Sequence, residues 1–182
     1  LSSKVVFFGK NYSEALTNSV TFDNIEYFEN KDARISIFSK LKLNVFGKSK
    51  EMILPFVIHE GFAYNLCAAF ALASCKIKVE SLLNINVNFF KNIKERFVFE
   101  KVGENYFLLD FYNSSYESIF TMYKCVKELL NGDFFYGINF IIGPVLETGD
   151  FNSIIHTKIF MLFKNCSQNL LLYNPHNDLV FS

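Results

Sequence analysis

The first half of the chain alternates between apolar and polar residues with the period of a β-strand. Two stretches place apolar side chains at every second position over most of their length, which is typical of strands with one buried face. Asn30-Lys-Asp32, between them, has the chemistry of a hairpin turn. The strands that the pattern predicts cover residues 4–8, 19–28, 34–46 and 52–58. Most of these strands are expected to pair antiparallel, as a meander.

The pattern then changes to that of a helix. From residue 61 to residue 75, apolar side chains recur at helical spacing and alanine is frequent. The predicted apolar stripe consists of Phe62, Leu66, Ala69, Phe70 and Ala73. A second helix is predicted over residues 79–90. The helices are expected to close the meander.

The second half alternates strands with helices. A charged link at 91–96 separates the halves, and we take it as a boundary between domains 1–92 and 93–182. Ser114-Ser-Tyr-Glu117 has the pattern of a capping box at a helix start. The predicted strands are 97–102, 106–111, 137–142 and 170–173, and the predicted helices are 116–130 and 153–165. This order indicates α/β architecture with a parallel sheet.

Polar residues follow two of the buried strands in this half. Asp110, Tyr112 and Asn113 lie at the carboxyl end of the strand that starts near Phe107, and Glu147 lies at that of the strand near Phe140. In an open α/β sheet, ligands bind beyond the carboxyl ends of the strands. We therefore expect these four side chains to meet at one ligand-binding edge.

Composition and charge exclude several classes of protein. The 182 residues are 51% hydrophobic and 20% charged, which is typical of a globular chain. Because 18 basic residues balance 18 acidic ones, no net field attracts nucleic acid. No apolar run is long enough to span a bilayer, and no signal peptide is visible. We expect a cytoplasmic location.

The cysteine and histidine spacing predicts no metal centre. The four cysteines form no CxxC pair, and the three histidines do not supply zinc-ligand spacing. These residues are Cys67, Cys75, Cys125 and Cys166, and His59, His156 and His176. Buried free thiols in a reducing compartment are the expected state of the cysteines.

Gly47-Lys-Ser49 invites interpretation as a phosphate-binding loop. That motif needs a glycine five positions before the Gly-Lys pair, where this chain has Lys42. It also needs a helix after the loop, whereas the pattern predicts a strand. We conclude that the segment is not a phosphate-binding loop.

Five polar residues have both a functional and a structural interpretation. Asn65 could bond an adenine edge, or it could bond backbone near a helix start. Arg96 could pair with a phosphate or form a surface ion pair. Asp110 could hold a ribose diol, or it could be a helix-dipole partner or a turn residue. Glu147 could contact substrate or lie in a solvated turn, and His156 could be packed, exposed or an acid–base group.

The order and spacing of these residues resemble the Mur ligase family of peptidoglycan synthesis. The family's helical Asn followed by Ala-Ala is similar to Asn65-Leu-Cys-Ala-Ala69, and its Arg-Phe junction to Arg96-Phe97. Its Asp-Asp-Ser-Tyr-Asn segment resembles Leu109-Asp-Phe-Tyr-Asn-Ser-Ser-Tyr-Glu-Ser118. Its Gly-Asp-Met-Leu-Glu-Leu-Gly resembles Gly143-Pro-Val-Leu-Glu-Thr-Gly149, followed by His156. The resemblance covers nearly the whole chain and is strongest to the members that add D-alanyl-D-alanine.

The resemblance implies a fold and a reaction. The fold is a Rossmann-like C-terminal domain preceded by a strand-meander-plus-helix remnant of the central ATPase domain. The reaction joins D-alanyl-D-alanine to a UDP-muramoyl tripeptide through an acyl phosphate, with ATP and Mg²⁺ as cofactors and a monomeric enzyme. Mg²⁺ would be bound mainly by segments outside this chain. The implied nucleotide contacts are Asn65, Arg96 and Asp110, and the implied amine-substrate contacts are Tyr112, Asn113 and Glu147.

The chain also departs from the family pattern. Gly61-Phe62 stands where the family has His-Asn, and Pro144 stands where it has an Asp. Leu109, Ser115 and Tyr116 replace an Asp, an Asn and a Pro. The phosphate-binding loop, the UDP-binding domain and the segment with the modified lysine are absent. The sequence therefore predicts that these 182 residues alone do not use ATP, and a non-catalytic binding or scaffold module is the alternative function.

Overall fold

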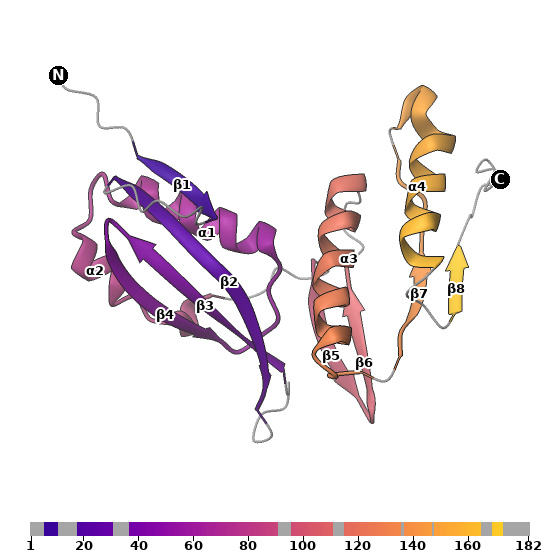
Figure 1. Cartoon of the computed structure of the whole chain (residues 1–182), viewed down its shortest axis with the longest axis horizontal. Coiled ribbons are helices and arrows are strands. Elements are labelled where there is room, and N and C mark those ends of the chain that lie inside the picture. The colour runs from indigo at the N-terminus through magenta and orange to yellow at the C-terminus, as the bar shows by residue number, and fades with distance from the viewer. Residues whose placement is uncertain are drawn as a thin grey trace. The chain divides into compact units, whose positions relative to one another are not determined.

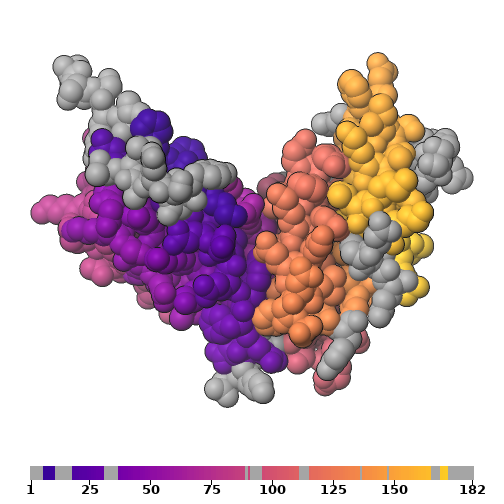
Figure 2. All heavy atoms as spheres, in the orientation of Figure 1, coloured from indigo at the N-terminus to yellow at the C-terminus, as the bar shows by residue number. Residues whose placement is uncertain are grey.

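The chain divides into two compact units, Leu1–Leu109 and Asp110–Ser182. The computed structural model describes residues 6–10, 18–30, 37–90, 96–110, 115–135, 137–146, 148–164 and 169–172. The first unit takes the indigo-to-pink part of the colour scale and the second the orange-to-yellow part (Figures 1 and 2). The family-domain boundary predicted at 92/93 falls among residues 91–95, outside the described residues, and stays a prediction.

A four-stranded sheet forms the first unit. Its strands lie in the order β1 (Phe7–Lys10), β2 (Ser19–Glu29), β3 (Ile37–Val45) and β4 (Lys48–Leu54). The β2–β3–β4 meander is antiparallel, as the alternating pattern predicts. β1 pairs parallel to β2. The helix α1 (Glu60–Ala73) lies across one face of this sheet (Figure 1).

The core of the first unit lies between the sheet and α1. Alternate residues of β3, among them Leu41 and Leu43, are buried, whereas the polar Lys40 and Lys42 between them are more exposed. Leu66 and Phe70 project from α1 into the same core cluster. The predicted helical stripe is correct at these two positions, but Ala69 is exposed. Burial of one face of each element explains both the period of two and the helical period.

The second helix predicted in this unit is shorter than expected. Instead of one helix over 79–90, the chain forms α2 (Val79–Leu83) and a single 3₁₀ turn, η1 (Val87–Phe89). Asn86 caps that turn, and its side chain accepts a hydrogen bond from the backbone N–H of Asn88. Asparagine side chains that bond nearby backbone compete with helical hydrogen bonds, which accounts for the interruption.

A hairpin completes the described part of the first unit. β5 (Val98–Val102) and β6 (Asn105–Leu109) pair antiparallel around Gly103, which has a φ of +61°. The left-handed conformation favours glycine at this position because a side chain there is strained. The hairpin predicted from the sequence is confirmed.

The second unit alternates helices and strands. Its elements are α3 (Tyr116–Asn131), β7 (Asn139–Ile142), η2 (Gly149–Phe151), α4 (Asn152–Lys164) and β8 (Asn169–Leu172). β7 and β8 are parallel, and α4 connects them. Phe140 of β7 packs on Phe163 of α4, with ring centroids 4.3 Å apart. The predicted β-α-β order is therefore confirmed.

The capping box at the start of α3 lies one residue later than predicted. Ser115 is the N-cap, its side chain accepts from the backbone N–H of Ser118, and the Ser118 hydroxyl accepts from the backbone N–H of Ser115. A serine can replace the usual acidic partner here because its hydroxyl also accepts a hydrogen bond.

Among the described residues, β6 and β7 each pair with a strand of their own unit. There β6 pairs with β5, and β7 pairs with β8, so that the strands make three separate sheets. The short turn at Gly103 makes local antiparallel pairing available to β6, whereas a parallel neighbour needs a long crossover. The chain has mixed α/β content, and the β7–β8 pair is parallel as expected. A sheet that joins β6 of the first unit to β7 of the second stays a prediction.

Candidate functional site

Asn65 lies on the exposed side of α1. Its side chain is exposed, whereas Leu66 and Cys67 beside it are buried against the sheet. Because the apolar stripe turns inward, the Asn65 amide projects to solvent, where it can both donate and accept hydrogen bonds. Exposure leaves it accessible to a ligand. Its predicted role toward adenine stays a prediction.

The Arg96-Phe97 junction is anchored to the start of α1. Phe97 is buried, has a left-handed φ of +50°, and places its ring edge-on to His59, with centroids 4.6 Å apart. His59 is the N-cap residue of α1, and its buried Nδ1 has no hydrogen-bond partner among the described residues. Burial lowers the pKa of His59 from its usual 6.5. Arg96, the predicted phosphate contact, is itself exposed beside this anchor.

The packing of His59 against Phe97 was not predicted from the sequence. Zinc ligation is the one role that the sequence raises for His59, and the spacing of the histidines and cysteines excludes it. The Arg-Phe doublet could have predicted that Phe97 is buried, because Phe is among the residue types most often found in the core. The partner residue, 38 positions earlier in the chain, is defined by the tertiary structure alone.

The other predicted site residues divide between described and undescribed parts of the chain. Asp110 follows the last residue of β6 and is half-buried. Tyr112, Asn113 and Glu147 lie outside the described residues, so their predicted meeting at one edge stays a prediction.

The turn after β7 is fixed by a buried histidine. His156, on α4, is 1% exposed, and its Nε2 accepts a hydrogen bond from the backbone N–H of Val145 at 3.0 Å. Its Nδ1 lies 2.8 Å from the carbonyl oxygen of Asn152. Because Nε2 accepts, the proton is on Nδ1, which donates to that carbonyl. Of the alternatives that the sequence left open for His156, the packed residue is correct.

The turn between β3 and β4 is not a phosphate-binding loop. Phe46 and Gly47 both have positive φ, 52° and 81°, and β4 begins directly at Lys48. Two left-handed residues in succession make the tight turn of a hairpin. The Lys48 ammonium pairs with Glu80 of α2. The interpretation drawn from the sequence is confirmed.

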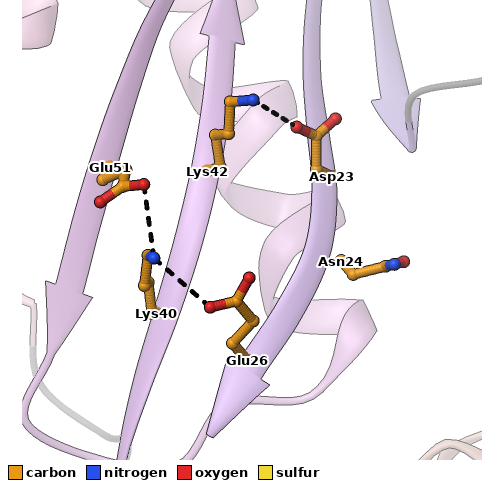
Figure 3. A pocket seen from close by; sticks show the side chains of 6 residues that line it. All are labelled: Asp23, Asn24, Glu26, Lys40, Lys42 and Glu51. Atoms are coloured by element: carbon orange, nitrogen blue, oxygen red, sulfur yellow. Dashed lines mark ion pairs between the residues drawn. The ribbon is translucent and has the colours of Figure 1, made fainter.

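A shallow charged hollow lies on the sheet face that points away from α1. Its volume is about 200 Å³, and Figure 3 shows its six lining residues on β2, β3 and β4. Lys40 lies 3.4 Å from both Glu26 and Glu51, and Lys42 lies 3.3 Å from Asp23. Hydrogen bonds to Glu26 and Glu51 raise the pKa of Lys40. Its three carboxylates all pair with its two lysines, so the hollow keeps a net charge of only −1.

The cysteines differ in exposure. Cys67 and Cys125 are buried free thiols, as predicted, but Cys75 is exposed because it follows the last turn of α1. Burial raises the pKa of the Cys67 thiol to about 12.

Within the described residues, no three His, Cys, Asp or Glu side chains gather in a group that could hold a metal ion. None of the described helices combines the length and apolarity needed to cross a bilayer.

Comparison with known proteins shows similarity in structure alone. No protein-family model matches the chain, and no curated protein matches it. MurF from Acinetobacter baumannii has a TM-score of 0.66 at 20% sequence identity, over 84% of this chain and 31% of that one. MurF ligase from Thermotoga maritima, in complex with ADP, has a TM-score of 0.66 at 16% identity, over 94% and 39% of the two chains.

A third solved structure gives the same result under a fuller name. The UDP-N-acetylmuramoylalanyl-D-glutamyl-2,6-diaminopimelate–D-alanyl-D-alanyl ligase from Acinetobacter baumannii has a TM-score of 0.62 at 18% identity, over 92% of this chain and 33% of that one. The chain therefore has the Mur ligase fold over the portion that it covers. Its structural neighbours are the MurF ligases, and it spans about a third of their length.

Proposed function

We propose that the chain is part of a MurF-type ligase of peptidoglycan synthesis. The supporting observation is the extent of the likeness, which covers up to 94% of the chain and continues across both compact units. In the proposed reaction, ATP phosphorylates the carboxylate of a UDP-muramoyl tripeptide. The amine of D-alanyl-D-alanine then attacks the acyl phosphate, which forms an amide and releases phosphate. The proposed enzyme is a cytoplasmic monomer.

The described residues supply binding groups in this proposal. Asn65 contacts adenine through its exposed amide, and Arg96 and Asp110 contact the ribose–phosphate region. Holding reactants in one geometry removes much of the entropic barrier to a reaction between two molecules. Tyr112, Asn113 and Glu147 line the amine-substrate side in the same proposal. Mg²⁺ is the second cofactor in this proposal, and the described residues gather no group of three His, Cys, Asp or Glu side chains to hold it.

Nucleotide binding tests the proposed role of Asn65. ADP is titrated into the full 182-residue chain, and amide shifts on α1 are followed by NMR. Asn65→Leu should weaken ADP binding about fivefold, since a lost hydrogen bond contributes about 1 kcal/mol. Asn84→Leu is the matched control, because Asn84 is also exposed in the first unit. Equal ADP affinity in the two variants would refute the adenine contact.

Asp110 is tested by a substitution that preserves its shape. Asp110→Asn should weaken nucleotide binding more than it lowers the free energy of unfolding, because the residue follows a strand end. Unchanged nucleotide affinity together with a large loss of stability would instead identify a structural turn residue.

The chain alone should release no phosphate from ATP, and turnover of about 1 per second or faster would contradict that expectation.

One observation favours the second candidate, a non-catalytic binding module. Phe62 stands where the resembling family has the Asn of its His-Asn pair, and its ring packs edge-on to Phe56 with centroids 5.8 Å apart. The position of an expected adenine contact is thus used for apolar packing. A chain that binds no ADP, yet remains folded, would support the module over the ligase portion.

A further inference from the structure

The turn that follows β7 is attached to α4 by one buried imidazole. His156 accepts from the Val145 N–H on one side of its ring and lies 2.8 Å from the Asn152 carbonyl oxygen on the other. Val145 is itself buried, so its N–H cannot be solvated by bulk water without movement of the turn. A buried backbone N–H requires a hydrogen-bond partner. His156 is therefore the group that satisfies this peptide.

The two hydrogen bonds define both the proton position and the geometry. An imidazole that accepts at Nε2 and donates at Nδ1 is neutral, and its two polar atoms lie on opposite sides of a rigid ring. Asn152 is the first residue of α4, one helical turn before His156. The ring thus connects the first turn of the helix to the peptide at Val145. A glutamine can both donate and accept, but it does so from one end of a flexible side chain.

The position of this peptide gives the contact a functional meaning. Val145 lies three residues beyond β7, at the carboxyl end of a strand in a parallel pair. Ligands of α/β sheets bind at such ends. A binding group is effective only when its supporting residues hold it within a fraction of an ångström.

We propose that His156 is a positioning residue that holds the 143–146 turn in its binding geometry on the amine-substrate side. This inference rests on the proposed function, because that function assigns D-alanyl-D-alanine to this side. His156 acts through the Val145 peptide and does not itself exchange a proton with substrate. Substitution should therefore weaken dipeptide binding and leave nucleotide binding unchanged.

The test uses the full chain and three variants. His156→Phe keeps the ring volume but removes both polar atoms, and His156→Gln retains one donor and one acceptor. Ile159→Ala is the matched control, because Ile159 is fully buried on α4, one turn away, with no polar atom. D-alanyl-D-alanine and ADP are titrated separately at a temperature at which every variant is folded, and NMR follows the amides of residues 143–146.

The expected result is a split between the two ligands. His156→Phe should weaken D-alanyl-D-alanine at least about tenfold, which corresponds to 1.4 kcal/mol, while ADP affinity stays within about twofold. Ile159→Ala should leave both affinities unchanged despite its loss of stability. The dipeptide affinity of His156→Gln should lie between those of His156→Phe and Ile159→Ala. Equal weakening of dipeptide binding by Ile159→Ala and His156→Phe would overturn positioning in favour of general core packing.

A separate readout distinguishes this proposal from the proposed function. Long-range proton–nitrogen correlation of the wild-type chain should show His156 neutral with its proton on Nδ1. The Val145 amide should be the most shifted of the turn amides in His156→Phe. If wild-type chain binds no dipeptide, the proposed function fails. An unchanged 143–146 turn in His156→Phe would overturn the positioning role, whatever the ligand result.

Discussion

Phe97 combines burial with a strained backbone, and the two can be separated by substitution. Its side chain is 6% exposed, packs against His59, and sits on a residue with a φ of +50°. Removing a buried Phe side chain destabilises a protein by about 3–5 kcal/mol. The left-handed conformation adds roughly 1–2 kcal/mol for any residue with a Cβ, but not for glycine. Phe97→Ala therefore loses the burial and keeps the strain, whereas Phe97→Gly loses both.

Phe99 provides the matched control. It is 5% exposed and lies two residues further on, within β5, and it is not among the positive-φ residues. At such an ordinary position, glycine is less stable than alanine by about 0.5–1 kcal/mol, because it has more backbone entropy to lose. At Phe97 the relief of strain exceeds that entropy term. Phe97→Gly should thus be more stable than Phe97→Ala by about 0.5–1 kcal/mol.

The assay must report on the first unit by itself, since a chain of two units need not unfold in one step. Hydrogen exchange of β3 and β4 peptides, measured by mass spectrometry at several urea concentrations, gives the local free energy of unfolding. The expected result is an opposite order of Gly and Ala at the two positions. If Ala exceeds Gly in stability at both Phe97 and Phe99, the left-handed strain at Phe97 is refuted.

Three further outcomes follow from burial, thiol exposure and helix capping. Because burial lowers the pKa of His59 below 6.5, the unfolded chain binds the extra proton as pH falls through 6.5, so the stability of the first unit should decrease there. In His59→Phe this decrease should be absent when the free energy of unfolding is measured from pH 8 to pH 5. An identical slope of stability against pH in wild type and His59→Phe would contradict the prediction. Alkylation at neutral pH should modify the exposed Cys75 well before Cys67, whose pKa is raised to about 12, and mass spectrometry of tryptic peptides checks the order. Ser115→Ala should destabilise α3 by about 1 kcal/mol, whereas Ser115→Asp should not; equal unfolding midpoints for the three proteins would exclude Ser115 as the cap.

Local patterns predicted the individual elements well. The alternation in β3 reflects one buried face, and the apolar positions of α1 at Leu66 and Phe70 reflect packing on that face. Both depend on residues near in sequence, so periodicity is sufficient to find them. The helix predicted over 79–90 failed because local side-chain competition at Asn86 outweighed the apolar pattern.

The candidate site could be predicted only as a set of residue types. The sequence identifies Asn65 as an amide on a helix, and the structure adds that it is exposed. The grouping of Asp110 with Glu147 stays a prediction, because β6 and β7 belong to different units and Glu147 lies outside the described residues. Strand pairing between distant segments is set by tertiary packing, which a one-dimensional pattern does not contain.

By itself the sequence determined the period of each strand and helix, the charge balance, and the motif spacing that resembles the Mur ligases. Only the tertiary structure decided that Phe97 packs on His59 and that His156 satisfies the Val145 N–H. Both contacts join segments that hydrophobic periodicity treats as independent. The partner of a buried polar or aromatic group depends on which surfaces the fold brings together, so the roles of His59 and His156 emerge only after the chain has folded.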